Sequence, residues 1–324
     1  MNILVTGAAG FLGRRLIEAL LQLGSLADRH GQLQPITRIT AFDREPVQGI
    51  TDPRVLVKGG DITDEQVLAN LIDADTDSIF HLAAVVSSQA ESDFELGMRV
   101  NFSATQGLLE RARQLGTCPK WVMTSSVAVF GGQLPQVVDD DQVWAPQSSY
   151  GTQKAMNDLL LADYSRRGFV DGRSLRMPTI VVRPGKPNLA ASSFASGIIR
   201  EPLNGLASVC PVPLRTRLWL MSPAQAIANL IHGHELAAQR LTEGRVINMP
   251  GLSQTVEQMI GALREVSGDE VAQRIELRPD ASIERIVGSW PGEFSARYAR
   301  SLGFTADENF ASVIRQFIRD YPPQ

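Results

Sequence analysis

The chain has 324 residues, of which 44% are hydrophobic and 20% are charged. This length suits one large domain or two modest ones, and the composition is that of an ordinary globular protein. A formal net charge of −4, with no basic block, argues against a nucleic-acid partner. Cys118 and Cys210 lie too far apart for a zinc motif or a disulfide framework, so no metal site is expected. We expect neither a signal peptide nor a membrane span, and we predict a cytoplasmic location.

The chain begins with a glycine-rich turn between a strand and a helix. An apolar run at 3–5 is followed, after the turn, by a helical apolar pattern at 11–20. Gly7 permits the turn, Gly10 lets the backbone approach a pyrophosphate, and Gly13 lets the helix pack on its strand. Phosphates would lie at the helix N-terminus, where free N–H groups favour anions. The turn therefore predicts a dinucleotide site that involves Gly7, Gly10, Phe11, Leu12 and Gly13.

Strands and helices alternate along the first part of the chain. The predicted strands are 3–5, 38–43, 54–58, 78–83, 120–126 and 174–183, and the helices are 14–23, 64–71, 93–115 and 150–167. Mostly apolar strands that alternate with helices indicate an α/β fold, a Rossmann-type doubly wound parallel sheet. The pattern loosens after residue 183, where helices are predicted at 223–234 and 256–266. We predict a dinucleotide-binding domain at 1–183 and a smaller C-terminal substrate-binding part at 184–324, with segments that cross between the two.

Two acidic residues follow the second and third strands. Asp43 can accept hydrogen bonds from the hydroxyls of the adenosine ribose and would repel a 2′-phosphate, which favours NAD over NADP. Arg44 is an opposing signal, because an arginine could bind that phosphate. The long interval between the glycines and Asp43 indicates an insertion at 27–35. Asp61, followed by Ile62, either meets the adenine amino group or caps the next turn.

Tyr150 and Lys154 are the residues that point to chemistry. Their spacing places both side chains on one face of a helix, about one turn apart. A nearby ammonium favours the phenolate and is expected to lower the pKa of a tyrosine from about 10 towards neutrality. Tyr150 is therefore a candidate general base or acid. Ser125 and Ser126 end the fifth strand, where a hydroxyl could hold the substrate oxygen or simply form a turn.

Taken together, these motifs resemble the extended short-chain dehydrogenase/reductases, which include the NAD-dependent epimerase/dehydratase proteins. The resemblance covers essentially the whole chain. It implies NAD as the cofactor and Ser126, Tyr150 and Lys154 as the catalytic residues, while His81 is expected to be a buried packing residue. The further cofactor contacts that the resemblance implies are Leu82, Ala83, Ala84, Pro178 and Ile180, besides Asp43, Asp61, Ile62, Tyr150 and Lys154.

The resemblance also narrows the reaction. Dehydratases of this group carry an Asp-Glu pair directly after the catalytic hydroxyl residue, whereas this chain has Val127 and Ala128. Epimerases usually have an aromatic pair with tyrosine before the following glycine, and Val129–Phe130 departs from it. The segments 85–91, 179–188 and 191–202 are most similar to a branch that oxidises a four-carbon sugar acid at C2 with NAD.

A sugar acid requires a cation or several donors for its carboxylate, and polar groups for its hydroxyls. Each candidate could instead be a cap, a turn residue or a surface cation. The predicted substrate-binding residues are Ser87, Ser125, Ser126, Tyr150, Lys186, Asn188, Ser192, Ser193 and Arg200.

The resemblance implies a homodimer formed through the helices at 93–115 and 150–167. Apolar stripes on these helices either form that interface or face the sheet. The stripes are Leu108, Leu109, Ala112 and Leu115 on the first helix and Ala155, Leu159 and Ala162 on the second. A nucleotide-sugar 4-epimerase with tightly bound NAD is the alternative function. A non-catalytic NAD sensor is disfavoured, because Tyr150 and Lys154 are both present.

Overall fold

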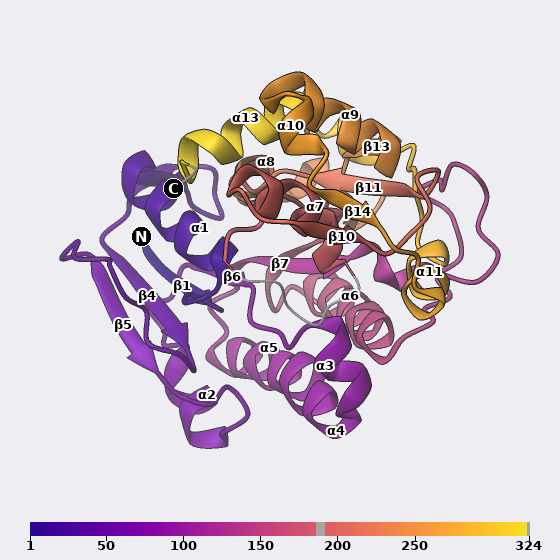
Figure 1. Ribbon diagram of the computed structural model, residues 1–324. Helices are drawn as coiled ribbons and strands as arrows, with labels where there is room; N and C mark the ends of the chain where they lie inside the picture. The colour runs from indigo at the N-terminus through magenta and orange to yellow at the C-terminus, as the bar shows by residue number, and fades with distance from the viewer. Residues whose placement is uncertain (186–191, 323–324) are drawn as a thin grey trace. The chain divides into compact units, whose positions relative to one another are not determined.

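The computed structural model describes residues 1–185 and 192–322, which form two compact units (Figure 1). Unit 1 comprises residues 1–129, 148–176 and 227–247, and unit 2 comprises 130–147, 177–226 and 248–324. Segments of the two units therefore alternate along the chain. The assignment of cofactor binding to residues 1–183 and of substrate binding to 184–324 stays a prediction.

Unit 1 is built on a seven-stranded sheet. The strand order is β12 (Val246–Asn248), β8 (Asp171–Met177), β7 (Lys120–Ser126), β6 (Ser78–His81), β1 (Asn2–Thr6), β4 (Arg38–Asp43) and β5 (Val55–Gly59). The five strands from β7 to β5 pair in parallel. This sheet confirms the predicted α/β fold of the Rossmann type.

Helices α5 and α6 lie on one side of the sheet and α1 on the other (Figure 1). The helical elements of unit 1 are α1 (Phe11–Leu23), α2 (Glu65–Leu71), α3 (Ser87–Ser92), α4 (Phe94–Gly97), the π-helical turn η1 (Met98–Ser103), α5 (Ala104–Leu115), the 3₁₀ turn η2 (Val127–Val129), α6 (Ser149–Arg166), α8 (Pro223–Glu235, from Ile227 onward) and η3 (Ala238–Arg240). The predicted helix at 93–115 is thus a run of α4, η1 and α5. The predicted insertion at 27–35 contributes to a small hairpin of β2 (Ser25–Ala27) and β3 (Leu33–Pro35).

Local chemistry explains where these helices begin and end. The Asp64 carboxylate caps α2 by accepting hydrogen bonds from the backbone N–H groups of Gln66 and Val67. The Ser148 hydroxyl caps α6 in the same way through the N–H of Gly151. Helix α5 ends at Gly116, which adopts the left-handed conformation that glycine tolerates.

The apolar stripe on α5 faces the core of unit 1. Leu108, Leu109 and Ala112 are each 0% exposed and pack in one cluster with Trp121 and Leu161. The prediction that this stripe forms a dimer interface is therefore wrong, and the alternative that it faces the fold holds. Leu115, the fourth residue of the stripe, is partly buried against the same cluster, so the stripe has little area left to bury against a second copy.

The predicted strand at 174–183 is wrong in its length, because it is interrupted at Pro178. Residues before the proline form β8 in the seven-stranded sheet, whereas Thr179–Ile180 form β9, which pairs with β11 (Arg217–Met221) in unit 2. Proline has no backbone N–H to donate to a sheet, so a strand tends to stop there. The apolar run continues past the proline, which is why its pattern suggested a single strand.

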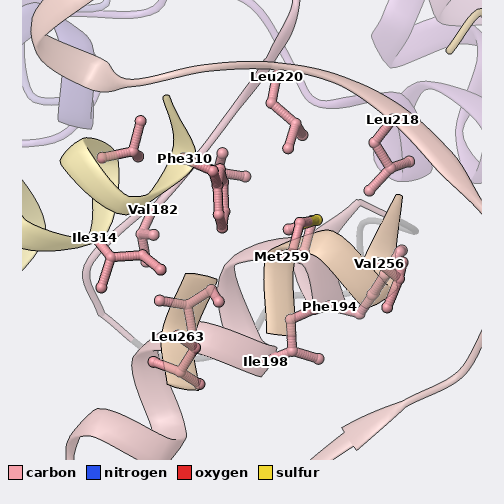
Figure 2. Packing of buried hydrophobic residues seen from close by; sticks show 14 of the residues in the cluster. Val182, Phe194, Ile198, Leu218, Leu220, Val256, Met259, Leu263, Phe310 and Ile314 are labelled. Atoms are coloured by element: carbon pink, nitrogen blue, oxygen red, sulfur yellow. The ribbon is translucent and has the colours of Figure 1, made fainter. Parts of the chain in front are cut away.

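Unit 2 contains two small sheets and a set of helices. The sheets are β13–β11–β9 and β10–β14, where β10 is Ser208–Cys210, β13 is Leu252–Thr255 and β14 is Ile275–Leu277. The helices are α7 (Ser193–Leu203), α9 (Val256–Ser267), α10 (Asp269–Ala272), α11 (Ala281–Gly288), α12 (Arg297–Ser301) and α13 (Phe310–Asp320). Figure 2 shows its core, where side chains from α7, α9 and α13 meet those of β11.

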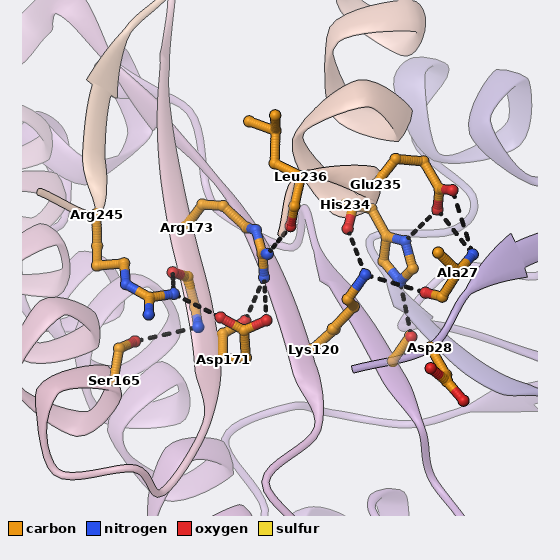
Figure 3. A network of polar contacts seen from close by, with 12 residues as sticks. Ala27, Asp28, Lys120, Ser165, Asp171, Arg173, His234, Glu235, Leu236 and Arg245 are labelled. Atoms are coloured by element: carbon orange, nitrogen blue, oxygen red, sulfur yellow. Dashed lines mark hydrogen bonds and ion pairs between the residues drawn. The ribbon is translucent and has the colours of Figure 1, made fainter. Parts of the chain in front are cut away.

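A buried polar network lies in unit 1 where β7 and β8 begin (Figure 3). The Lys120 ammonium donates to the carbonyl oxygens of Ala27 and His234, at 3.0 and 2.8 Å. Arg173 donates to the Leu236 carbonyl. Two buried cations therefore satisfy carbonyl groups at and just beyond the C-terminus of α8, where positive charge is favourable. Burial lowers the pKa of His234 to about 4, so this ring is neutral at pH 7.

Candidate active site

The carboxyl ends of β1, β4, β6 and β7 meet at one edge of the sheet. Thr6 pairs in register with Phe42 on one side and with His81 on the other, and His81 pairs with Met123. The strand ends and the loops that follow them are therefore brought together, and they carry the glycine turn after β1, Asp43 at the end of β4 and the two serines at the end of β7. In open parallel sheets, ligands bind outside this edge.

The glycine turn leaves no room for side chains. Gly7 has a φ of +74°, and a Cβ added there would lie 2.7 Å from the backbone nitrogen of Ala83. A Cβ on Gly13 would lie 2.1 Å from the Gly7 carbonyl oxygen. Gly10 is exposed and is the N-cap residue of α1, where no side chain bonds to the first N–H groups of the helix. The turn and the first N–H groups of α1, which include partly exposed Phe11 and Leu12, thus fit a dinucleotide pyrophosphate.

Asp43 lies next to this turn at the end of β4. Its carboxylate accepts hydrogen bonds from the backbone N–H groups of Ala9, at 2.9 Å, and Glu45, at 3.0 Å. The side chain remains partly exposed, as an acceptor for ribose hydroxyls must be. Asp61 instead accepts from the N–H and hydroxyl of Thr63, which lower the pKa of its carboxyl. Its turn-capping role is therefore visible, and Ile62 beside it is buried.

His81 joins three elements beneath this edge. Its ring contacts the hydroxyls of Thr6 on β1, at 2.7 Å, and Thr105 on α5, at 2.9 Å. Because Thr105 donates its own proton to the Asn101 carbonyl, Nε2 of His81 carries the hydrogen and Nδ1 accepts from Thr6. Burial lowers the pKa of His81 to about 3. The histidine predicted to be buried is therefore neutral, and both of its ring nitrogens are hydrogen-bonded. Thr6 in turn accepts a hydrogen bond from the backbone N–H of Ala83.

Lys154 and Tyr150 lie in the first turns of α6, beside the end of β7. The Lys154 ammonium donates to the Thr124 carbonyl at 2.8 Å and lies 5.6 Å from the centre of the Tyr150 ring. Burial lowers the pKa of Lys154 to about 8, so the ammonium is still protonated at pH 7. The start of the helix is fixed by Glu91 of α3, whose carboxylate accepts from the N–H of Ser149 at 2.8 Å. The pair is thus held against the strand that carries the two serines.

The two serines of β7 have different surroundings. The Ser126 hydroxyl accepts a hydrogen bond from the N–H of Ala128 at 3.1 Å, which leaves its own proton available to a ligand. Ser125 is 3% exposed, and its hydroxyl has no hydrogen-bond partner among the residues that the structure describes. A buried hydroxyl without a partner costs free energy, so such a group indicates a place where a polar ligand is expected.

Sequence reasoning missed a set of buried amides behind the Tyr150–Lys154 pair. Asn101, in η1, bonds to both backbone groups of Val85 and to the side chain of Gln153. Asn157 donates to the Asn101 carbonyl at 2.6 Å. The signal was the residue pattern of α6, whose buried face is polar where a packing helix would show an apolar stripe. These amides link α6 to the loop after β6.

Other predicted residues are placed as follows. In unit 1, Leu82 and Ala83 are partly buried, Ala84 is exposed, and Ser87 begins α3. In unit 2, Pro178 and Ile180 are buried, and Ser192 and Ser193 stand at the start of α7. Arg200 is 6% exposed, and its guanidinium is engaged by Glu201 and by the Arg183 carbonyl. Lys186 and Asn188 lie outside the described residues.

Residues 1–185 and 192–322 show neither a membrane-spanning helix nor a metal site. Within these ranges, no helix is both long and apolar enough to cross a membrane. In the same part of the chain, no three His, Cys, Asp or Glu side chains are grouped so that they could hold a metal ion.

Comparisons with known proteins agree with this geometry. Residues 3–218 match the NAD dependent epimerase/dehydratase family. The chain is 58% identical to the D-erythronate dehydrogenase of Cupriavidus necator, over 99% of this chain and 98% of that protein. It is 46% identical to the D-erythronate dehydrogenase of Haemophilus influenzae, over 98% and 99%. A solved structure named as the nucleoside-diphosphate-sugar epimerase of Agrobacterium tumefaciens superimposes with a TM-score of 0.93 at 43% identity, over 99% of this chain and 94% of that one.

The chain therefore belongs to the NAD-dependent epimerase/dehydratase family, within the extended short-chain dehydrogenase/reductases. The resemblance in the sequence motifs is confirmed. The predictions of an NAD-dependent oxidoreductase and of NAD as its cofactor are confirmed as well.

Proposed function

We propose that the chain catalyses the NAD-dependent oxidation of the C2 hydroxyl of D-erythronate to 2-dehydro-D-erythronate. Two relatives named for this substrate support the proposal, because they match the chain at 58% and 46% identity over nearly its full length. The structural observation that carries it is the buried Lys154 ammonium held beside the ring of Tyr150. This pair suits proton abstraction from an alcohol.

In this mechanism, Tyr150 is the general base that takes the proton of the C2 hydroxyl. Lys154 keeps a positive charge near the phenol ring and so favours the phenolate. Ser126 donates to the substrate oxygen and fixes it next to Tyr150. NAD, when bound, supplies the nicotinamide that accepts the hydride from C2. The glycine turn, Asp43 and the loop at Leu82–Ala84 are the parts of unit 1 proposed to hold it.

Recognition of the sugar acid is proposed to involve hydroxyl donors at the end of β7 and the start of α3. Ser125 is the best supported, because its hydroxyl is buried and has no partner among the described residues. Ser87 lies at the start of α3. Ser192, Ser193 and Arg200, in unit 2, also stay candidates, and Arg200 is the weakest because its guanidinium already pairs with Glu201.

The test is to screen four- to six-carbon sugar acids as substrates and to monitor the reduction of NAD by its absorbance at 340 nm. D-erythronate should give the highest kcat/KM. Tyr150→Phe should lower kcat by roughly 10²–10⁴-fold and leave NAD binding largely intact. Tyr164→Phe is the matched control, because that phenol lies on the same helix but bonds to Glu110. Loss of less than about tenfold in Tyr150→Phe would contradict the general-base role.

A nucleotide-sugar 4-epimerase is the second candidate, because the similar Agrobacterium tumefaciens structure is named as a nucleoside-diphosphate-sugar epimerase. Such an enzyme would use the same tyrosine and lysine but keep NAD bound throughout its cycle. It would be purified with one NAD per chain, and no sugar acid would reduce added NAD. Release of NAD on desalting, together with activity on a sugar acid, would exclude it.

We also propose a homodimer, now through the exposed side of α4 and α6. Phe94 on α4 and Leu159 on α6 are 61% and 60% exposed, and the two helices contact each other. A two-fold interface would introduce a substitution twice, so Leu159→Arg should give a monomer. Leu23→Arg on α1, at a site 51% exposed, is the control that should stay dimeric. Light scattering that shows wild-type monomer at micromolar concentration would contradict the dimer.

Location in the cytoplasm is likewise a proposal. Cys118 and Cys210 are free thiols, as is usual for proteins of a reducing compartment.

A further inference from the structure

A buried ion pair lies one helical turn beyond Lys154. The Asp158 carboxylate, on α6, accepts a hydrogen bond from the Ser174 hydroxyl at 2.5 Å and from Nε of Arg176 at 2.8 Å. Ser174 and Arg176 both belong to β8. Asp158 and Ser174 are 0% exposed, and Arg176 is 2% exposed. The mechanism proposed above makes no use of this pair.

Asp158 is placed to act on Lys154 through space. The two residues are four positions apart on α6, which puts their side chains on one face with Cβ atoms about 6 Å apart. Each oxygen of Asp158 already accepts a hydrogen bond from β8. The carboxylate therefore acts on the Lys154 ammonium through its electric field and not through a direct hydrogen bond. Both side chains are buried, so solvent and salt screen this field only weakly. Asp158 is also the charged group that most favours the protonated form of Lys154.

The other ionisable groups around Lys154 have definite roles. Tyr150 lies one turn earlier on the same helix, and its ring is near the ammonium. His81, from β6, is neutral, because burial and the nearby Lys154 charge lower its pKa to about 3. Arg176, from β8, opposes Asp158 directly. The electric field at the Tyr150–Lys154 pair is therefore that of the Asp158 carboxylate, weakened by the opposite charge of Arg176.

We propose that Asp158 is a positioning residue for hydride transfer, which acts through Lys154 and sets the pH range in which the Tyr150–Lys154 pair has its active charges. Arg176 sets how strongly Asp158 acts. The effect on catalysis rests on the proposed function, whereas the effect on ionisation does not.

The sign of the effect follows from the active charges, a phenolate on Tyr150 and an ammonium on Lys154. The acid limb of the kcat/KM profile reports loss of the tyrosine proton, and the alkaline limb reports loss of the lysine proton. A buried negative charge makes both protons harder to remove. Removal of the Asp158 charge should therefore move both limbs to lower pH, and removal of the Arg176 charge should move both to higher pH.

The experiment measures kcat/KM for D-erythronate against pH in four variants. Asp158→Asn should move both limbs down by about one pH unit, which corresponds to a modest buried interaction. Arg176→Met should move both limbs up by less. Asp163→Asn is the matched control, because this carboxylate lies on the same helix but is exposed and pairs with Arg166. Its profile should equal that of the wild type.

Each single variant leaves a buried charge unpaired and could fail to fold. The double variant Asp158→Asn/Arg176→Met removes both charges, and it should still move both limbs down, by less than Asp158→Asn, because the field of Asp158 dominates at Lys154. Limbs that stay within about 0.2 pH units in the folded variants, with only kcat reduced, would overturn the proposal in favour of a packing role.

A second readout separates this proposal from the proposed function. Tyr150 can be titrated by ¹³C-tyrosine NMR in the NAD complex without any substrate, and Tyr150→Phe assigns its signal among the four tyrosines. A shift of its titration midpoint to lower pH in the double variant supports the role of Asp158 even if no sugar acid is oxidised. An unchanged midpoint in that variant refutes it even if D-erythronate is the substrate.

Discussion

Two buried histidines should make the fold sensitive to mild acid. Burial lowers the pKa of His81 to about 3 and that of His234 to about 4. In the unfolded chain a histidine has a pKa of about 6.5. Between pH 6.5 and pH 4, the unfolded state therefore binds protons that the folded state does not. The free energy of unfolding must fall as the pH falls through this window.

The magnitude follows from the difference in proton binding. At pH 5, the unfolded histidines are about 1.5 pH units below their pKa, while both folded rings are still neutral. At about 1.4 kcal/mol per unit, each ring costs about 2 kcal/mol, and the two together cost about 4 kcal/mol. This is a large part of a typical stability of about 5–15 kcal/mol. Carboxyl groups with lowered pKa values, such as those of Glu110 and Asp52, also contribute to the free energy of unfolding. Their contribution is lost only at lower pH, when these groups become protonated.

Urea unfolding followed by circular dichroism at pH 7, 6 and 5 measures this slope. His234→Asn should be less stable than the wild type at pH 7, because the contacts of this ring with Ser78 and with Glu235 are lost or weakened (the Glu235 contact is drawn in Figure 3). Its pH slope should be about halved. His30→Asn is the control for replacing a histidine, because that ring is exposed. A free energy of unfolding that differs by less than about 1 kcal/mol between pH 7 and pH 5 would refute the reasoning.

Two further predictions concern the cofactor site. The wild type should prefer NAD to NADP in kcat/KM, and Asp43→Ala should narrow the preference because the repulsion of a 2′-phosphate is lost; equal values in the wild type would show that Arg44 dominates. Gly13→Ala should abolish NAD binding in calorimetry, because the added Cβ would lie 2.1 Å from the Gly7 carbonyl oxygen. Its control, Gly261→Ala in α9, has no atom within 4 Å of the new Cβ, so it should keep NAD binding and raise stability by about 0.5–1 kcal/mol.

The sequence was sufficient for features that depend on neighbouring residues. The glycine turn and the one-turn spacing of Tyr150 and Lys154 each follow from local geometry, and the fold, the family and NAD are confirmed. Strand 174–183 failed because a continuous apolar run hides the break at Pro178. The α5 stripe was ambiguous because an apolar face packs equally well against a sheet or a second copy.

Contacts between distant segments were beyond the reach of pattern reasoning. His81 bonds to Thr6, 75 positions away, and to Thr105, 24 positions away, and no periodicity in the sequence links them. His234 is the last residue of the helix predicted at 223–234, and it is buried and bonds to Ser78 across 156 positions. Each of these rings has polar partners that only the folded chain brings together, so the burial of His81 could be expected but its bonding could not.

The same limit explains why α6 gave a clear motif but no clear packing face. Its buried positions include Gln153, Lys154, Asn157 and Asp158, which are held by polar groups of η1, α5, β7 and β8. Apolar faces can slide or repack at small cost, whereas hydrogen bonds and ion pairs fix both distance and direction. A helix anchored in this way holds the Tyr150 phenol in one register relative to β7. Replacing Gln153 and Asn157 by apolar residues of similar volume should therefore lower kcat and leave the free energy of unfolding almost unchanged, because placement of the phenol depends on the contacts that such replacements remove.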